Sequence, residues 1–387
     1  MEASCDFRSF FLAGFECSSH CRTHGERLDL IAATKHDRYC QADYARLRDV
    51  GILSVRDGVR WHLIETAPYR YDFSSVLPML RAARCTGMQV IWDVFHYGWP
   101  DDLDLFSAEF VKRFHAFGRE LARVVADETD GPPYFSPVNE ISFFSWAAGE
   151  AGVIYPFFRF RGNELKAHLV RACIAAIDAI RSVIPLARFV QADPVINIVT
   201  SDEMDDCTKA AANAHERSQL DAWDMLIGRL YPELGGAPEY LDIVGANYYV
   251  HNQWLYGGHF IESADPRYRP LHDILEEVYR RYRRPLFLSE TGIEDERRPA
   301  WLRYVCDEMS EAWSRGVPVE GICLYPILNY PGWIDQRRCQ TGLWDYCDSS
   351  GYREIYEPMA QELARQQMRI SGTVGRKCWG ASMPTHA

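Results

Sequence analysis

Eight short apolar segments recur along this 387-residue chain, separated by longer segments with the periodicity of amphipathic helices. Strands that are buried on both faces of a parallel sheet have nearly continuous apolar sequences, and most of the eight segments show this pattern. We therefore expect strands at residues 10–18, 52–61, 89–97, 133–140, 188–193, 241–250, 285–291 and 319–328.

Helix signals occupy the intervening segments. Ser107, with Glu109 two residues later, is a typical helix start. Asn163 is expected to cap a second helix at 164–183, which ends before Pro185. One apolar stripe on the first helix is formed by Phe110, Phe114, Phe117, Leu121 and Val125. Further helices are expected at 213–229, 271–283 and 299–315.

Strands and helices that alternate eight times without an obvious linker predict a single-domain (β/α)8 TIM barrel over residues 1–366. A doubly wound open sheet is the structural alternative, but no glycine-rich phosphate-binding turn follows the first strand. Residues 367–387 lack periodicity, and we expect them to form a loosely ordered tail.

Composition excludes several classes of partner. With 42 Lys and Arg against 54 Asp and Glu, the formal charge is −12, which argues against nucleic acid and anionic membranes. Acidic Glu2 and Asp6 stand where a signal peptide would carry positive charge. The twelve cysteines form no CxxC pair, so free buried thiols in a reducing compartment are expected. We predict a cytoplasmic protein without a cofactor.

Catalytic and binding residues of such barrels lie at the carboxyl ends of the strands. A buried apolar strand has no structural need for polar residues there. The polar residues that end the expected strands are Glu16, Arg56, Asp93, His96, Asn139, Glu140, Asn247, Tyr249 and Glu290.

Two of these residues could form a catalytic pair. Glu140 ends the fourth expected strand and Glu290 the seventh, and these two strands face each other across the mouth of a barrel. Glycoside hydrolysis requires two carboxyl groups on either side of the scissile bond. Taken alone, each glutamate has a plainer interpretation, since most glutamates lie on the surface or cap helices.

Seven segments resemble glycoside hydrolase family 1, the β-glucosidase family of clan A, and they occur in the family's order. FLAGFECSSH resembles FLWGAATSS, SVRDGVRW resembles YRFSISW, and DVFHYGWP resembles TLFHWDLP. PVNE resembles TFNE, GANYY resembles GLNYY, and LSETG resembles ITENG. LYPILNYPGW resembles VWSLLDNFEW. Together these segments span most of the expected barrel.

The resemblance implies a retaining β-glycosidase that binds a carbohydrate substrate, with Glu140 as acid/base and Glu290 as nucleophile. The residues that it implies for substrate binding are Arg56, His96, Asn139, Asn247, Tyr249 and Trp333. No metal is implied.

The chain departs from the family at two sugar-binding positions. The family's sugar-binding glutamine falls at Cys21, and its last-strand glutamate falls at Gly332. Sugar specificity therefore cannot be carried over, and relaxed or unusual sugar recognition is expected. The residues placed to compensate are Glu16, Asp335 and Arg337. The lysine of phospho-sugar members is also missing, although Arg337 and Arg338 are close to its position.

Three other interpretations stay open. Cys17, His20, Cys21 and His24 could bind zinc, but their spacing matches no standard site. A clan A endo-glycanase, such as a family 5-like cellulase, would share the two glutamates. A catalytically silent carbohydrate-binding barrel is the third interpretation, and the presence of both glutamates argues against it.

Overall fold

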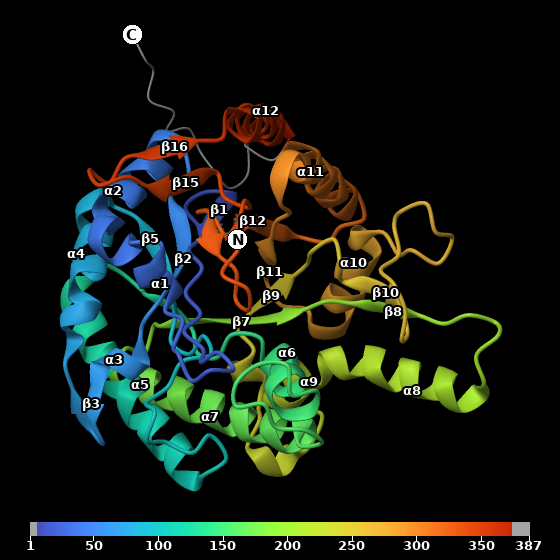
Figure 1. The fold of residues 1–387 in the computed structure, drawn as a ribbon, viewed down its shortest axis with the longest axis horizontal. Coiled ribbons are helices and arrows are strands. Elements are labelled where there is room, and N and C mark those ends of the chain that lie inside the picture. The colour runs from blue at the N-terminus through green and yellow to red at the C-terminus, as the bar shows by residue number, and fades with distance from the viewer. Residues whose placement is uncertain (1–5, 374–387) are drawn as a thin grey trace.

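The computed structural model describes residues 6–373 and has eight parallel strands closed into a barrel (Figure 1). Around the barrel the order is β1-β12-β11-β9-β7-β6-β5-β2. Each strand lies within one of the eight expected segments or extends it by one residue, so the (β/α)8 fold is confirmed. The strands are β1 Phe11–Gly14, β2 Ser54–Gly58, β5 Gln89–Asp93, β6 Tyr134–Ser136, β7 Arg188–Pro194, β9 Ile243–Asn247, β11 Leu286–Thr291 and β12 Val319–Leu324.

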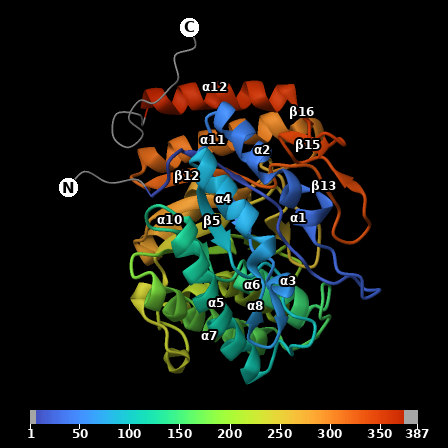
Figure 2. The ribbon, with the colours of Figure 1, turned by 90° about the vertical axis from the view of Figure 1, so that its left-hand side faces the viewer.

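Helices surround the barrel on the outside (Figures 1 and 2). The longer ones are α2 His36–Asp49, α4 Leu77–Thr86, α5 Ala108–Glu128, α7 Gly162–Val183, α8 Asp206–Arg217, α10 Leu271–Tyr282, α11 Arg298–Ser314 and α12 Glu357–Thr373. The short ones are α1 Leu30–Ala33, α3 Trp61–Ile64, α6 Ile141–Phe144 and α9 Asp221–Leu226. Short paired strands outside the barrel are β3 Glu65–Ala67 with β4 Arg70–Tyr71, β8 Asn197–Val199 with β10 Gln253–Leu255, β13 Tyr330–Pro331 with β14 Arg338–Cys339, and β15 Trp344–Cys347 with β16 Arg353–Ile355.

Helix α5 shows how the sequence pattern builds the wall of the barrel. The Ser107 side chain accepts a hydrogen bond from the Phe110 N–H, which caps the helix as expected. The apolar stripe of α5 packs on Trp61, whose ring stacks on Phe117 at 5.4 Å between centroids. Phe114 lies 5.1 Å from the same indole. The stripe thus fixes α5 against the segment that follows β2.

Two details of the helix predictions were wrong. Asn163 is not the cap of α7, because the helix already begins at Gly162 with Arg161 as its N-cap. The helix expected at 213–229 is two helices, α8 and α9, separated by a 3-10 turn. Helix α8 lies on an extension beside β8 and β10 that leaves the barrel (Figure 1).

The prediction that residues 367–373 belong to a loosely ordered tail was wrong. Helix α12 continues to Thr373, because its last turns are held by the rest of the molecule. The Gln367 side-chain amide donates to the Val50 carbonyl at 2.7 Å, and Ile370 is buried. The remaining part of the predicted tail, 374–387, lies outside the described residues.

The described part of the chain contains no helix long and apolar enough to cross a membrane. All ten cysteines within residues 6–373 are free, and most are buried, in agreement with the expected absence of a disulfide framework. Cys5 and Cys378 lie outside the described residues.

Candidate active site

Glu290 is a buried carboxylate held by one charged and one neutral donor. It lies in β11 near the carboxyl end of the strand. Arg56, from β2, donates to its Oε1 at 2.8 Å, and the Tyr249 hydroxyl donates to its Oε2 at 2.9 Å. A guanidinium at this distance strongly favours the ionised form of the carboxyl group.

Glu140 is the second buried carboxylate, and its hydrogen-bond donors are neutral. The Tyr97 hydroxyl donates to its Oε2 at 2.6 Å, and Asn247 Nδ2 donates to its Oε1 at 2.8 Å. Its backbone has φ 49°, and that of Tyr97 has φ 63°. Left-handed backbone at residues other than glycine costs free energy and is concentrated at functional sites. Here it turns both side chains toward the same space.

The two carboxyl groups titrate as a pair. Burial raises the pKa of Glu140 and that of Glu290, and the negative charge of Glu140 raises the pKa of Glu290 further. Arg56 and the Tyr249 hydroxyl oppose this rise at Glu290. Among residues 6–373, the guanidinium of Arg56 donates to Glu290 and only neutral groups donate to Glu140, although burial and the charge of Glu140 raise the pKa of Glu290 to about 7.

A buried network fixes Arg56 in place. One guanidinium nitrogen donates to both carboxylate oxygens of Asp93, at 3.0 and 2.9 Å, and to Asn139 Oδ1 at 2.9 Å. Burial raises the pKa of Asp93, but Arg56 and His96 together outweigh this effect and the pKa is lowered overall. Asn139 in turn places its Nδ2 3.0 Å from His96 Nε2. A ligand that bound either side chain would have to compete with this contact between Asn139 and His96.

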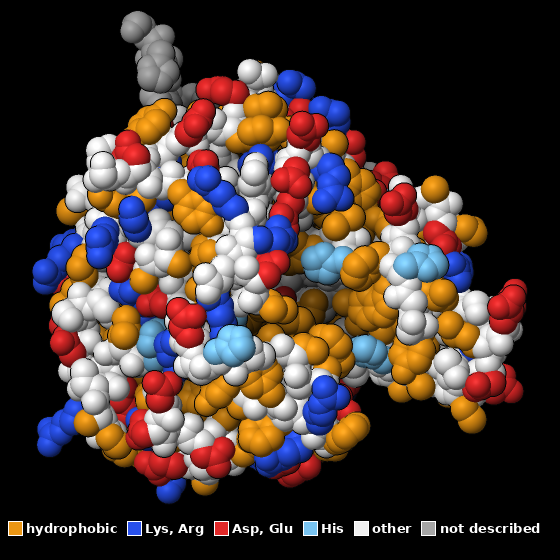
Figure 3. All heavy atoms as spheres, viewed as in Figure 1, with side chains coloured by type: hydrophobic (Ala, Val, Ile, Leu, Met, Phe, Trp, Pro, Cys, Tyr) orange, Lys and Arg blue, Asp and Glu red, His pale blue; other side chains and the backbone are white. Residues whose placement is uncertain are grey.

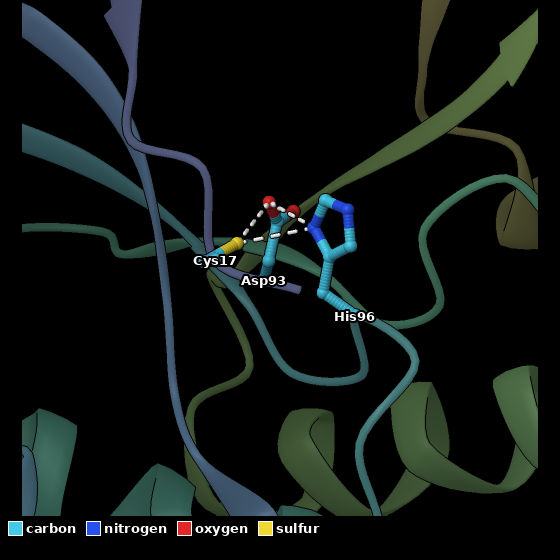
Figure 4. Close-up of side chains that lie close together, drawn as sticks. All are labelled: Cys17, Asp93 and His96. Atoms are coloured by element: carbon cyan, nitrogen blue, oxygen red, sulfur yellow. Dashed lines mark hydrogen bonds and ion pairs between the residues drawn. The ribbon is translucent and has the colours of Figure 1, made fainter. Parts of the chain in front are cut away.

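Cys17, Asp93 and His96 form the one group of potential metal ligands found among residues 6–373 (Figure 4). Cys17 Sγ lies 3.0 Å from His96 Nδ1 and 3.5 Å from Asp93 Oδ2. Two observations favour a hydrogen-bonded thiol over a metal centre. Arg56 already occupies both oxygens of Asp93, and burial, followed by the charge of Asp93, raises the pKa of the Cys17 thiol well above its usual value. A metal requires the thiolate.

The zinc alternative at the end of β1 is not supported by the structure. Cys17 points toward Asp93 and His96, whereas His24 is exposed. His20 packs on Trp333, with 5.0 Å between ring centroids. The absence of a metal stays a prediction.

Trp333 borders the same space as the carboxylates. Its ring lies 5.7 Å from that of Tyr97, which bonds Glu140. In the space-filling view, a hollow opens near the middle of the face on which α6, β8 and β10 lie, bordered by hydrophobic side chains and histidines (Figure 3). Glu140 immediately precedes α6.

The structure brings all eight residues implied by the resemblance into one cluster, although Asn247 contacts Glu140 rather than open space. Their roles stay predictions. Sequence reasoning missed Tyr97, whose only signal was its place directly after His96 in DVFHYGWP. It also left Asp93 without a role, although this residue ends the third strand. Arg60, from the same SVRDGVRW segment as Arg56, contacts Asp29 and Asp37 instead of the two glutamates.

No protein-family model matches the sequence, and no curated protein matches it. Solved structures do match the fold. A β-glucosidase from Thermotoga maritima in complex with glucoimidazole has a TM-score of 0.75 at 14% identity, over 94% of this chain and 99% of that one. A family 1 β-glucosidase from the same organism has a TM-score of 0.74 at 16% identity, over 92% and 97%. The AHE enzyme from Alicyclobacillus herbarius has a TM-score of 0.76 at 16% identity, over 95% of this chain and 99% of that one.

These matches cover nearly the whole of both chains. The chain therefore has the (β/α)8 fold of the family 1 β-glucosidases, with a strongly diverged sequence. The resemblance inferred from the seven segments is confirmed at the level of the fold.

Proposed function

We propose that the protein is a retaining β-glycosidase, with Glu140 as acid/base and Glu290 as nucleophile. One observation carries the proposal: two buried carboxylates, one in β11 and one shortly after β6, have unlike donors, and β9 and β7 separate the two strands in the barrel. Glu290 accepts from a guanidinium, and Glu140 accepts only from an amide and a phenol. Such a pair holds one proton and one charge, as double displacement requires.

The reaction would proceed in two steps. The Glu290 carboxylate attacks the anomeric carbon while Glu140 gives its proton to the departing glycosidic oxygen, which leaves a glycosyl ester on Glu290. Glu140, now ionised, takes a proton from water, and the resulting hydroxide attacks the anomeric carbon and releases Glu290. Both inversions occur at the same carbon, so the β configuration is retained.

The fold relatives support a carbohydrate as the ligand. The Thermotoga maritima β-glucosidase was solved with glucoimidazole and with deoxynojirimycin, both glucose-like inhibitors. We infer that this chain binds a sugar ring between Glu140, Glu290 and Trp333. Aromatic side chains commonly contact the apolar face of such rings.

A screen of aryl β-glycosides, followed by NMR of the first sugar released, tests the proposal. We expect hydrolysis with the β anomer formed first. Glu290→Gln should lose activity by about 10³-fold or more on every substrate, since it removes the nucleophile. Glu140→Gln should be far more damaging for poor leaving groups than for activated aryl groups, which need little protonation. Release of the α anomer first would exclude retention.

A further inference from the structure

The two missing sugar anchors are not restored at their own positions. A Cβ on Gly332 would lie 2.5 Å from Asp335 Oδ1 and 3.3 Å from Arg337 Cγ, so the exposed side chains of Asp335 and Arg337 occupy the space into which a longer side chain would extend. The backbone around Gly332 is instead held by Arg22, which donates to the carbonyls of Gly332 and Trp333 at 3.2 Å each. Hydrogen bonds to the sugar hydroxyls must therefore come from other residues.

Glu16 is a buried carboxylate that the catalytic pair does not use. It follows β1 and is 6% exposed. Its Oε1 accepts the N–H of Ser18 at 3.0 Å, and no hydrogen bond to Oε2 is found among residues 6–373. It lies close enough to Glu290 and His96 for their charges to interact, although burial dominates and raises the pKa of Glu16. Its carboxylate is thus beside the proposed sugar site, with one oxygen free.

Two more buried polar atoms in the same neighbourhood lack a partner in the described structure. They are His20 Nδ1 and Trp333 Nε1. His20 is 3% exposed, and its ring packs on that of Trp333 at 5.0 Å between centroids. Buried polar groups in native proteins nearly always have a hydrogen-bond partner, so these two atoms can bind a polar ligand or water beside Glu16.

The other residues that could compensate are more exposed than Glu16. Asp335 and Arg337 are more than half exposed, and Arg337 pairs with Glu294. Arg338 pairs with Asp345. None of these arginines is therefore free inside the pocket to neutralise a phosphate or a carboxylate on the sugar.

We propose that Glu16, assisted by His20 and the Trp333 indole N–H, binds the hydroxyl groups of the non-reducing sugar in place of the residues missing at Cys21 and Gly332. The substrate class is accordingly an uncharged sugar, because a phosphorylated sugar or a uronate would bring its negative charge to Glu16 and Glu290. This inference rests on the proposed glycosidase function.

The test compares the wild type with Glu16→Gln, using Asp130→Asn as a control in an exposed carboxylate between α5 and β6. We expect Glu16→Gln to lower kcat/KM for 4-nitrophenyl β-glucoside by about 30-fold, as for loss of a charge-assisted bond. On at least one of the 3-, 4- and 6-deoxy glucosides the effect should shrink to less than about threefold, since the bonded hydroxyl is already absent. Asp130→Asn should stay within about twofold of the wild type on all substrates.

A second part of the test compares substrates with the wild-type protein alone. The wild type should prefer the glucoside over the 6-phosphoglucoside and the glucuronide by at least about 100-fold in kcat/KM. Comparable rates on a charged sugar overturn the inference. So does a folded Glu16→Gln protein, checked by circular dichroism, that keeps wild-type kcat/KM on the glucoside.

Calorimetric binding of deoxynojirimycin separates this inference from the proposed function. If the wild type cleaves no glycoside but binds the inhibitor, and Glu16→Gln weakens binding at least tenfold, the glycosidase proposal fails and the role of Glu16 stands. If the wild type cleaves glycosides and Glu16→Gln binds as tightly as the wild type, only the inference about Glu16 fails.

Discussion

At the scale of single residues, Tyr97 and Asn247 hold the carboxyl group of Glu140 from two sides, at 2.6 and 2.8 Å. Burial favours the neutral carboxyl group, whereas both donors favour the charged one. Burial also raises the pKa of Tyr97 well above its usual value, so its hydroxyl keeps the proton that it donates. The balance of these effects determines the pH at which Glu140 ceases to act as an acid.

Tyr97→Phe should therefore shift the alkaline limb of the activity profile to higher pH. The variant removes a donor that stabilises the ionised form, so the pKa of Glu140 rises further. A bond to a charged group is worth about 1.5 kcal/mol or more, which corresponds to roughly one pH unit. The measurement is kcat/KM for an aryl β-glucoside as a function of pH.

Tyr248→Phe is the matched control for this prediction. Tyr248 is equally buried, but its hydroxyl contacts the Tyr268 hydroxyl at 2.9 Å and Gln253 rather than the catalytic pair. Its loss should lower stability without moving either limb. An unshifted alkaline limb in Tyr97→Phe would show that Tyr97 does not act on Glu140.

The sequence could identify Glu140, Glu290 and Arg56 because each is a polar residue within or just after a buried strand. Tyr97 escaped prediction because its contact depends on backbone geometry. Both Tyr97 and Glu140 adopt left-handed φ values, and nothing in their residue types favours this conformation. The unlike environments of the two glutamates were likewise invisible, since they arise from residues on different strands.

At the scale of elements, the end of β1 is packed too closely to accept any side chain. A Cβ on Gly14 would lie 1.9 Å from Tyr325 Cδ2, and Tyr325 directly follows β12, the neighbour of β1. Gly14→Ala should therefore destabilise the protein by about 2 kcal/mol or more through overpacking. Urea unfolding followed by tryptophan fluorescence would measure this loss.

Gly372→Ala provides the contrast within helix α12. A Cβ at this position meets nothing within 4 Å. Since alanine favours helix over glycine, the variant should be unchanged or more stable by up to about 1 kcal/mol. If Gly14→Ala were as stable as Gly372→Ala, the close packing of β1 against Tyr325 would be wrong.

Elements whose residues follow one burial pattern throughout could be predicted from the sequence. A segment in which the burial pattern changes could not. The strands are buried on both faces, and α5 has one apolar stripe, so one period describes each. The segment 213–229 reads as one stripe, but its first part belongs to α8, in which only Ala212 is buried. Its later part belongs to α9, which packs on the barrel wall through residues such as Trp223. Periodicity cannot tell that these residues face different surfaces.

At the scale of the whole molecule, helix α12 packs against both α11 and the segment that follows α2. It lies across α11, on the side of the barrel where α2 also lies (Figures 1 and 2). Glu362 accepts from Arg303 of α11, and Gln367 donates to the carbonyl of Val50, which follows α2. The second contact joins residues more than 300 positions apart in the sequence. Local periodicity therefore could not have shown that α12 extends beyond residue 366.

The contacts of residues 367–373 predict different stabilities for two truncated chains. A chain of residues 1–366 lacks the last turns of α12, including the Gln367 bond and the buried side chain of Ile370. A chain of residues 1–373 retains both. Burial of one isoleucine contributes about 1.5–3 kcal/mol and the amide bond about 1 kcal/mol. The ion pair of Arg369 with Asp307 is exposed and adds little.

We therefore expect the 1–366 chain to unfold at lower urea concentration than the 1–373 chain, with a free energy of unfolding lower by about 2–4 kcal/mol. Gln367→Ala and Ile370→Ala in the longer chain should each reproduce part of this loss, with the larger part from Ile370. Because both residues are remote from the catalytic pair, kcat/KM of the folded fraction should stay unchanged. Equal stability of the two chains would mean that the folded unit ends at residue 366 after all.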